Sequence, residues 1–212
     1  MILQVSGWET PATHYPLNKV GRAKITRPKG RKGVYRMEGV KGYEYFEVKK
    51  AIPITTLRIG RETVMVDDPL QWIGMQEIAK HCKGNVITAG LGLGLIVHAL
   101  ANNPDVKSIT VVEREEDVIE LVKPLVLDAV KNNGKEIQII KGDIFENITP
   151  EYNTIILDIW WGRGSVKIYF EMMEAYSAIR AAYPRMKVYL WGIKDHEFNP
   201  AIAAKEAAER EL

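Results

Sequence analysis

The spacing of apolar and polar residues changes near residue 66 and divides the chain into two parts. Residues 34–66 contain short apolar and β-branched runs that glycines and a proline interrupt. Such runs between turn residues are typical of antiparallel strands. We expect strands at 34–37, 43–49, 55–59 and 63–66. With the basic segment before them, they predict a first unit at residues 1–66, made of a basic arm and a small N-terminal antiparallel β module.

Residues 67–212 alternate between helical and strand-like spacing. Asp68 fits the N-cap of a first helix and Pro69 its first position, and apolar residues follow at helical spacing as far as Cys82. Later helices are expected at 93–102, 115–132 and 165–182, with a short turn near Phe145. Mostly apolar strands are expected at 85–89, 108–113, 137–141, 154–159 and 186–191. This alternation predicts an α/β unit with a doubly wound, mainly parallel sheet of about five strands, covered on both faces.

The length and composition fit one ordinary domain with a small addition. The chain has 212 residues, of which 46% are hydrophobic and 26% charged, as in globular proteins. No apolar run approaches the roughly 18 residues that cross a bilayer, and no signal peptide pattern opens the chain. The single cysteine, Cys82, has no CxxC motif or Cys/His cluster beside it, and the four histidines show no metal-ligand spacing. We therefore expect a cytoplasmic protein with no membrane segment, disulfide or metal site.

Positive charge is concentrated at the N-terminus. Residues 1–50 contain 11 Lys/Arg and 4 Asp/Glu, whereas the remaining residues contain 18 and 23. The density is highest between Arg22 and Arg36. Such a segment can be a solvated face or can meet phosphate groups. Nucleic acid is thus a candidate partner of the basic arm.

A glycine-rich loop connects the strand at 85–89 to the helix after it. Its sequence is Gly90-Leu91-Gly92-Leu93-Gly94. Backbone without side chains can approach a ligand closely, and the N-terminus of the following helix favours electron-rich atoms. The dinucleotide motif G-x-G-x-x-G would require glycine where Leu95 stands, so NAD is the weaker interpretation. A tight turn without a ligand remains the alternative.

Two acidic positions follow the next two strands. Glu113 ends the strand at 108–113, where a doubly wound fold places a carboxylate that can accept both hydroxyls of a ribose. Asp143 follows the strand at 137–141 and can accept from an adenine amino group, while Ile144 packs on the ring. As alternatives, Glu113 is an exposed acid at a helix start, and Asp143 caps the turn at Phe145.

With this loop and these acids, residues 70–192 resemble the class I S-adenosylmethionine-dependent methyltransferase superfamily. The resemblance implies a Rossmann-like methyltransferase fold, with S-adenosylmethionine bound by Gly90, Gly92, Gly94, Glu113, Asp143 and Ile144. The chain is most similar to the spermidine synthase-like branch, through Met75-Gln76-Glu77 and Val111-Val112-Glu113-Arg114. That branch implies decarboxylated S-adenosylmethionine as cofactor and places Glu77 near the cofactor and amine. Otherwise Glu77 is an acid on a helix surface.

The end of the strand at 154–159 supplies the candidate catalytic residue. Asp158 lies at the crevice outside the strand ends, where ligands bind in open α/β sheets. It can hold or deprotonate an acceptor group. Trp160 and Trp161 follow it and can stack on a planar or cationic substrate, or pack beneath a loop. Trp161 stands where the aminopropyltransferase branch has a second acid, and Thr88 stands where many methyltransferases have one.

Three functions remain open at this point. The first is methyl transfer from S-adenosylmethionine to a small-molecule acceptor that the sequence does not identify. The second is aminopropyl transfer from decarboxylated S-adenosylmethionine, which Trp161 opposes. The third is nucleoside binding without catalysis. A homodimer is a candidate assembly for each of them.

Overall fold

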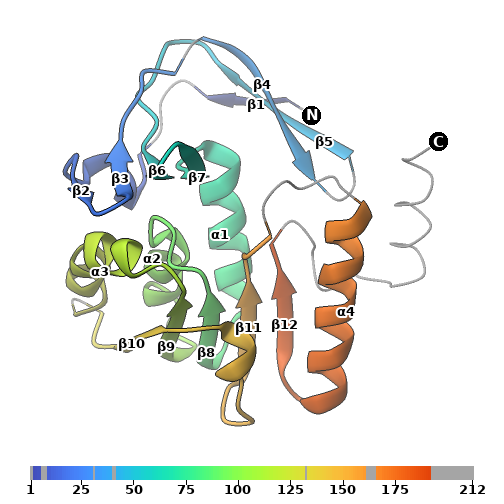
Figure 1. Ribbon diagram of the computed structural model, residues 1–212. Coiled ribbons are helices and arrows are strands. Elements are labelled where there is room, and N and C mark those ends of the chain that lie inside the picture. The colour runs from blue at the N-terminus through green and yellow to red at the C-terminus, as the bar shows by residue number, and fades with distance from the viewer. Residues whose placement is uncertain are drawn as a thin grey trace.

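The computed structural model describes residues 2–5, 9–30, 32–39, 42–131, 133–160 and 166–191, and its strands form three sheets (Figure 1). The largest sheet has five strands in the order β10-β9-β8-β11-β12, and all neighbouring strands are parallel. The strands are β8 (Gly84–Ala89), β9 (Val106–Glu113), β10 (Glu136–Lys141), β11 (Thr154–Leu157) and β12 (Lys187–Leu190). The predicted parallel sheet of five strands is confirmed.

The order of these strands reverses at one point. The chain runs outward from β8 to β10 and then crosses to β11, on the other side of β8. In open α/β sheets such a reversal leaves a crevice at the carboxyl ends of the two strands beside it. The ends of β8 and β11, at Ala89 and Leu157, are therefore where a ligand site is expected.

Helices cover both faces of this sheet, as expected for strands without polar alternation. Val86 of β8 belongs to a core shared with α1, α2 and α3, whereas Ile87 belongs to a core shared with α4. The helices are α1 (Pro69–His81), α2 (Leu95–Ala101), α3 (Glu116–Lys131) and α4 (Val166–Ala182). A 3₁₀ turn, η2 (Ile144–Glu146), follows β10. The prediction of a doubly wound, Rossmann-like fold is confirmed.

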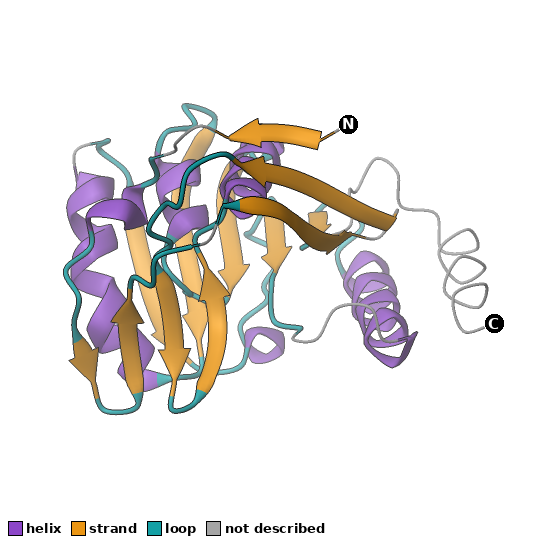
Figure 2. Cartoon of the chain, turned by 90° about the horizontal axis from the view of Figure 1, so that it is seen from above, coloured by secondary structure: helices purple, strands orange, loops and turns teal. Residues whose placement is uncertain are grey.

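The N-terminal strands form two further sheets. Strands β2 (Lys19–Val20), β3 (Ala23–Thr26), β6 (Thr56–Ile59) and β7 (Glu62–Val66) form an antiparallel sheet in the order β2-β3-β6-β7. We call it the four-stranded sheet. Strands β1 (Ile2–Val5), β4 (Gly33–Gly39) and β5 (Gly42–Val48) form the other, in which β1 is parallel to β5. In Figure 2 these three strands lie near the N label.

Part of the segment that was expected to be a basic arm is thus folded. In β3, Ala23 and Ile25 are buried, whereas Lys24 between them is exposed. The alternation turns one side of the strand towards α3 and the other towards solvent. The buried side chains of β3 join the same core as α1, α2 and α3. Residues on both sides of the expected boundary at residue 66 therefore share one core.

Candidate functional site

A cavity of about 640 Å³ lies at the carboxyl ends of the parallel strands. Its lining comes from the ends of β8, β9 and β11, from the turns after β8 and β10, and from α1, β6 and β7. Figure 1 shows β6 and β7 above these strand ends. The volume is in the range of small-molecule sites, about 300–1,000 Å³. The cavity therefore occupies the crevice that the strand order predicts.

Two of the three loop glycines line this cavity. Gly90 and Gly92 have φ values of +85° and +52°, which only glycine adopts without strain. Gly94, with φ +73°, is the N-cap of α2 and is not part of the lining. A Cβ atom on Gly94 would lie 2.2 Å from Cγ1 of Val126 in α3. Gly94 thus permits close packing of two helices, whereas the first two glycines present backbone to the cavity.

The loop is held from the N-terminal side by a methionine. The backbone N–H of Leu93 donates to Sδ of Met65 in β7, at 3.0 Å. A Cβ atom on Gly92 would lie 2.4 Å from the same sulfur. The sequence gave no indication of this contact, because Met65 is 28 residues away and belongs to another sheet. The four-stranded sheet therefore helps to shape the glycine loop.

Glu113 is positioned beside the loop at the end of β9. Its Oε2 accepts from the backbone N–H of Leu91 at 2.8 Å, and its Oε1 accepts from that of Glu115 at 2.9 Å. Each carboxylate oxygen can accept more than one hydrogen bond, so both can still receive a ligand hydroxyl. The two backbone bonds fix the carboxylate at the edge of the cavity that it lines.

Asp143 and Ile144 line the cavity after β10. Oδ1 of Asp143 accepts from the backbone N–H of Phe145 at 3.0 Å, so Asp143 caps η2. Ile144 is buried, and the half-exposed Phe145 also contributes to the lining. The capping alternative for Asp143 is therefore observed, together with a place beside the cavity.

Asp158 and Trp160 line the cavity after β11, and both are half-buried. A Cβ atom on Gly90 would lie 3.2 Å from the backbone oxygen of Asp158, so the glycine loop passes close to this residue. Trp161 lies outside the described residues. The structure thus brings Asp158 together with Gly90, Gly92, Glu113 and Asp143.

Glu77 lies elsewhere. It is on the exposed side of α1, where its carboxylate contacts Lys80 Nζ at 3.0 Å and His81 Nε2 at 3.3 Å. The hydrogen bonds from Lys80 and His81 lower the pKa of Glu77. Among the residues of α1, it is Gln71 and Met75 that line the cavity, together with the N-cap Asp68.

Thr88 contributes a polar atom to the cavity wall. It lies in β8, is fully buried, and lines the cavity. Within the described ranges, its Oγ1 has no hydrogen-bond partner. An unpaired buried hydroxyl is costly, and a polar ligand atom can satisfy it. This hydroxyl stands at the position where the sequence resemblance would place an acid.

The charge of the cavity lining is strongly negative. Six carboxylate side chains line it, and one cationic side chain, Arg114, accompanies them. The acids are Asp68, Glu113, Glu115, Asp143, Asp158 and Glu171. A cleft with charges of one sign concentrates ligands of the opposite sign. The site is therefore suited to a cationic ligand and poorly suited to phosphate groups.

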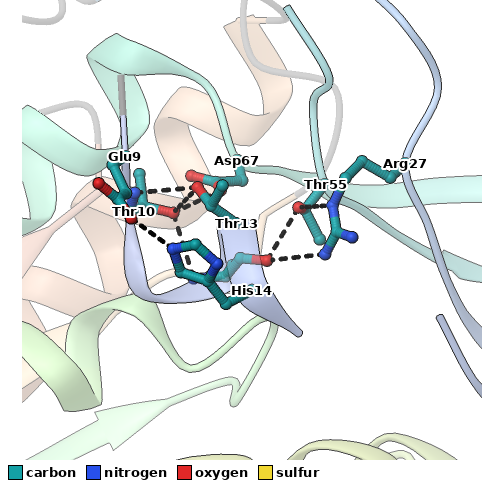
Figure 3. A network of polar contacts seen from close by, with 8 residues as sticks. Glu9, Thr10, Thr13, His14, Arg27, Thr55 and Asp67 are labelled. Carbon is teal, nitrogen blue, oxygen red and sulfur yellow. Dashed lines mark hydrogen bonds and ion pairs between the residues drawn. The ribbon is translucent and has the colours of Figure 1, made fainter. Parts of the chain in front are cut away.

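A buried polar cluster fixes the N-terminal segment next to α1 (Figure 3). Thr10 donates through Oγ1 to Oδ2 of Asp67 at 2.5 Å, and Asp67 is 1% exposed. Arg27 donates to the backbone oxygen of Tyr15 at 2.6 Å and to Thr55 Oγ1 at 3.1 Å. Burial raises the pKa of Asp67 to about 6, although the Thr10 hydrogen bond opposes this.

A second buried pair joins the same segment to α2. The hydroxyl of Tyr15 lies 2.6 Å from Nε2 of His98. Burial lowers the pKa of His98 to about 4, so the imidazole is neutral near pH 7 and its Nε2 can accept from the tyrosine. Burial also raises the pKa of Tyr15, which keeps the hydroxyl protonated as the donor. Both clusters lie outside the cavity lining.

Searches of the described residues for two other kinds of site gave no candidate. No group of three or more His, Cys, Asp or Glu side chains in that part of the chain could hold a metal ion. No helix in it is long and apolar enough to span a membrane.

Comparison with known proteins gave structural neighbours only, because no family model and no curated protein sequence matches the chain. A dimethyladenosine transferase from Plasmodium falciparum is 16% identical, with a TM-score of 0.43 over 58% of this chain and 41% of that one. Shikimate dehydrogenase from Mycobacterium tuberculosis is 17% identical, with a TM-score of 0.39 over 82% and 51%. A SAM-dependent methyltransferase from Thiobacillus denitrificans, solved with S-adenosyl-L-homocysteine, is 14% identical, with a TM-score of 0.34 over 48% and 42%.

The chain thus spans about half or less of the length of these three proteins. They include methyltransferases and a dehydrogenase, so likeness at this level does not distinguish methyl transfer from dinucleotide chemistry. The spermidine synthase-like branch stays a prediction from the sequence. The function has to be inferred from the cavity itself.

Proposed function

We propose that the chain is a methyltransferase that uses S-adenosylmethionine and transfers its methyl group to an acceptor bound beside Asp158. The observation that carries this proposal is the charge of the cavity, where six carboxylates face one arginine. S-adenosylmethionine has a cationic sulfonium and a cationic amino group, which such a lining attracts. A dinucleotide carries two phosphates, which the same carboxylates would repel. The charge therefore favours the methyl donor over NAD.

The residues of the cavity fit the parts of this cofactor. The exposed backbone of Gly90 and Gly92 allows close approach, and the carboxylate of Glu113 is oriented to accept two ribose hydroxyls. Asp143 can accept from the adenine amino group, and Ile144 can pack on the ring. The unpaired hydroxyl of Thr88 offers a further polar contact. When bound, S-adenosylmethionine supplies an electrophilic methyl group.

The residues after β11 face the acceptor. Asp158 can hold a nucleophilic group and accept its proton, which is a role that a carboxylate at hydrogen-bond distance performs. Trp160 can stack on a planar or cationic acceptor. Since the parallel sheet carries both the loop and Asp158, these side chains hold the acceptor in a fixed position relative to the cofactor.

Isothermal titration calorimetry tests the cofactor assignment. We expect S-adenosylmethionine and S-adenosylhomocysteine to bind, and NAD not to bind. Glu113→Ala should weaken binding more than tenfold, because hydrogen bonds to a charged group contribute about 1.5–3 kcal/mol. The matched control is Glu120→Ala, since Glu120 is an exposed acid of α3 outside the cavity. Tighter binding of NAD, or no binding of any adenosylated ligand, would refute the proposal.

Two further measurements separate the roles within the site. Asp158→Asn should leave the affinity for S-adenosylmethionine within about twofold, whereas transfer from methyl-labelled cofactor to an acceptor pool should fall. A loss of affinity as large as that of Glu113→Ala would place Asp158 among the cofactor residues instead. A clear preference for decarboxylated S-adenosylmethionine in the same titrations would favour aminopropyl transfer.

A further inference from the structure

We propose that the outer face of the four-stranded sheet binds the phosphodiester backbone of a nucleic acid through Lys19, Lys24 and Arg58. These three cations occupy directly paired positions on neighbouring strands. Lys19 of β2 pairs with Lys24 of β3, and Lys24 pairs with Arg58 of β6. Because neighbouring strands lie about 4.8 Å apart, the row is about 10 Å long. We call these three residues the cation row.

The cation row lies on the side of the sheet that faces away from the core. Ala23 and Ile25, the neighbours of Lys24 in β3, are buried, and Val20 packs against the core. Since side chains alternate between the two faces of a strand, Lys24 and its paired residues point outward. Lys19 and Lys24 are exposed, and Arg58 is half-buried.

No acid neutralises the cation row in the part of the chain that the structure describes. Neither Lys19 nor Lys24 makes an ion pair there, and the Arg58 guanidinium donates instead to the backbone oxygen of Arg61 at 2.5 Å. In β7 the residue paired with Arg58 is Thr63. The face therefore presents cations and a hydroxyl, which are donors that phosphate oxygens accept.

Three like charges at paired positions weaken the sheet, because directly opposed like charges repel one another. Lys19 has a structural explanation, since lysine on an edge strand discourages pairing with other chains, and β2 is an edge strand. Lys24 and Arg58 stand on β3 and β6, which have neighbours on both sides. Edge protection does not account for them, and binding of a polyanion does.

Other basic residues of the same segment are used inside the protein. Arg27 donates to two backbone oxygens and to Thr55, as described above. Arg22 forms an ion pair with Glu115 at 3.3 Å, and its backbone N–H donates to Asp117 at 2.7 Å. The structure thus separates basic residues that stabilise the fold from those that are available to a partner.

The shape of the cation row favours nucleic acid over other anions. A single phosphate or carboxylate would contact one or two of its members, whereas a strand of nucleic acid offers phosphates in series. Thr63 belongs to the cavity lining as well as to the pair with Arg58. A bound strand would therefore pass close to one side of the cavity. This binding does not require the proposed methyl transfer.

Fluorescence anisotropy with labelled 20-nucleotide RNA and DNA strands tests the proposal. The test variant replaces Lys19, Lys24 and Arg58 by glutamine. The matched control replaces Lys83, Lys107 and Lys187 by glutamine. These control lysines are also exposed, and lie at the amino ends of β8, β9 and β12. Thermal melting checks that both variants are folded.

For the wild type, raising the salt from 50 to 200 mM should weaken binding to single strands by about 18-fold or more, from a slope of about −0.7 per phosphate contact over three contacts. The triple cation-row variant should bind at least tenfold more weakly at 50 mM salt, and its salt slope should be smaller by about two. The control variant should keep most of the wild-type slope.

Three results would overturn the proposal. The first is equal binding by the cation-row variant and the control variant. The second is no binding of either nucleic acid by the wild type at 50 mM salt. The third is binding to vesicles of phosphatidylcholine and phosphatidylserine without binding to oligonucleotides, which would indicate a membrane surface as the partner.

Discussion

Replacing Asp67 by asparagine removes a buried carboxylate and should change how the stability of the protein depends on pH. Burial raises the pKa of Asp67 from 3.8 to about 6 in the folded chain. Between these values the folded state binds more protons than the unfolded state, so the stability that Asp67 contributes is present below pH 3.8 and is lost as the pH rises through 6. From the 2.2-unit shift the whole effect is about 3 kcal/mol, of which about 2.5 kcal/mol falls between pH 4 and pH 7.

His98 should act in the opposite direction over the same pH range. Burial lowers its pKa from 6.5 to about 4, so below pH 6.5 the unfolded state binds the proton first. Its contribution destabilises the fold progressively as the pH falls towards 4, by about 3 kcal/mol in total. The two effects nearly cancel. The wild type should therefore be almost equally stable at pH 4.5 and pH 6.5 as far as these two groups are concerned.

Urea unfolding followed by tryptophan fluorescence at several pH values between 4 and 7 measures both effects. The difference in unfolding free energy between Asp67→Asn and wild type should increase by about 2.5 kcal/mol from pH 4 to pH 7. For His98→Gln the difference should decrease by a similar amount. Any constant offset from lost contacts does not matter. Parallel curves for Asp67→Asn and wild type would show that the carboxylate keeps an ordinary pKa, and would refute the reasoning.

Three other substitutions test single contacts by the same unfolding measurements. Gly94→Ala should cost about 2–5 kcal/mol, because alanine is strained at positive φ and would overlap Val126; Gly134→Ala, at φ +65° with open space around it, should cost only the backbone part. Tyr15→Phe should cost about 1–3 kcal/mol by leaving Nε2 of His98 buried without its donor. Met65→Leu should cost about 1 kcal/mol through the unpaired N–H of Leu93, and an unchanged stability would show that the sulfur does not support the loop.

The parallel sheet could be predicted from the sequence because its signals are local. In β8, Val86 and Ile87 are consecutive apolar residues, and burial on both faces of a parallel sheet produces that pattern. In β3 the signal is weaker, since Ala23 and Ile25 are separated by Lys24 in a strongly basic segment. That strand is stabilised by pairing with β6, more than 30 residues later in the chain. Its register depends on contacts that no short window of sequence contains.

The candidate site was predictable to the same extent. Gly90, Gly92, Glu113, Asp143 and Asp158 all follow strands, and the carboxyl ends of parallel strands meet at one edge. Their common place at the cavity follows from strand order alone.

Other positions depended on packing that spacing does not indicate. Gly94 faces α3 because Val126 lies against it, and the sequence does not distinguish it from the two glycines before it. Asp68 could be recognised as a helix cap, yet its place in the cavity wall depends on how α1 is oriented over the sheet.

The shared core makes the N-terminal sheet and the parallel sheet parts of one cooperative unit. Ile25 of β3 and Val86 of β8 belong to the same cluster of buried residues, so neither sheet can open without exposing the other's apolar surface. Amide protons in β3 and β8 should thus exchange with solvent through the same opening event. A ligand in the cavity, which touches β7 as well as the glycine loop, would slow exchange in both sheets together. Strand β3, which never contacts that ligand, would then report its binding.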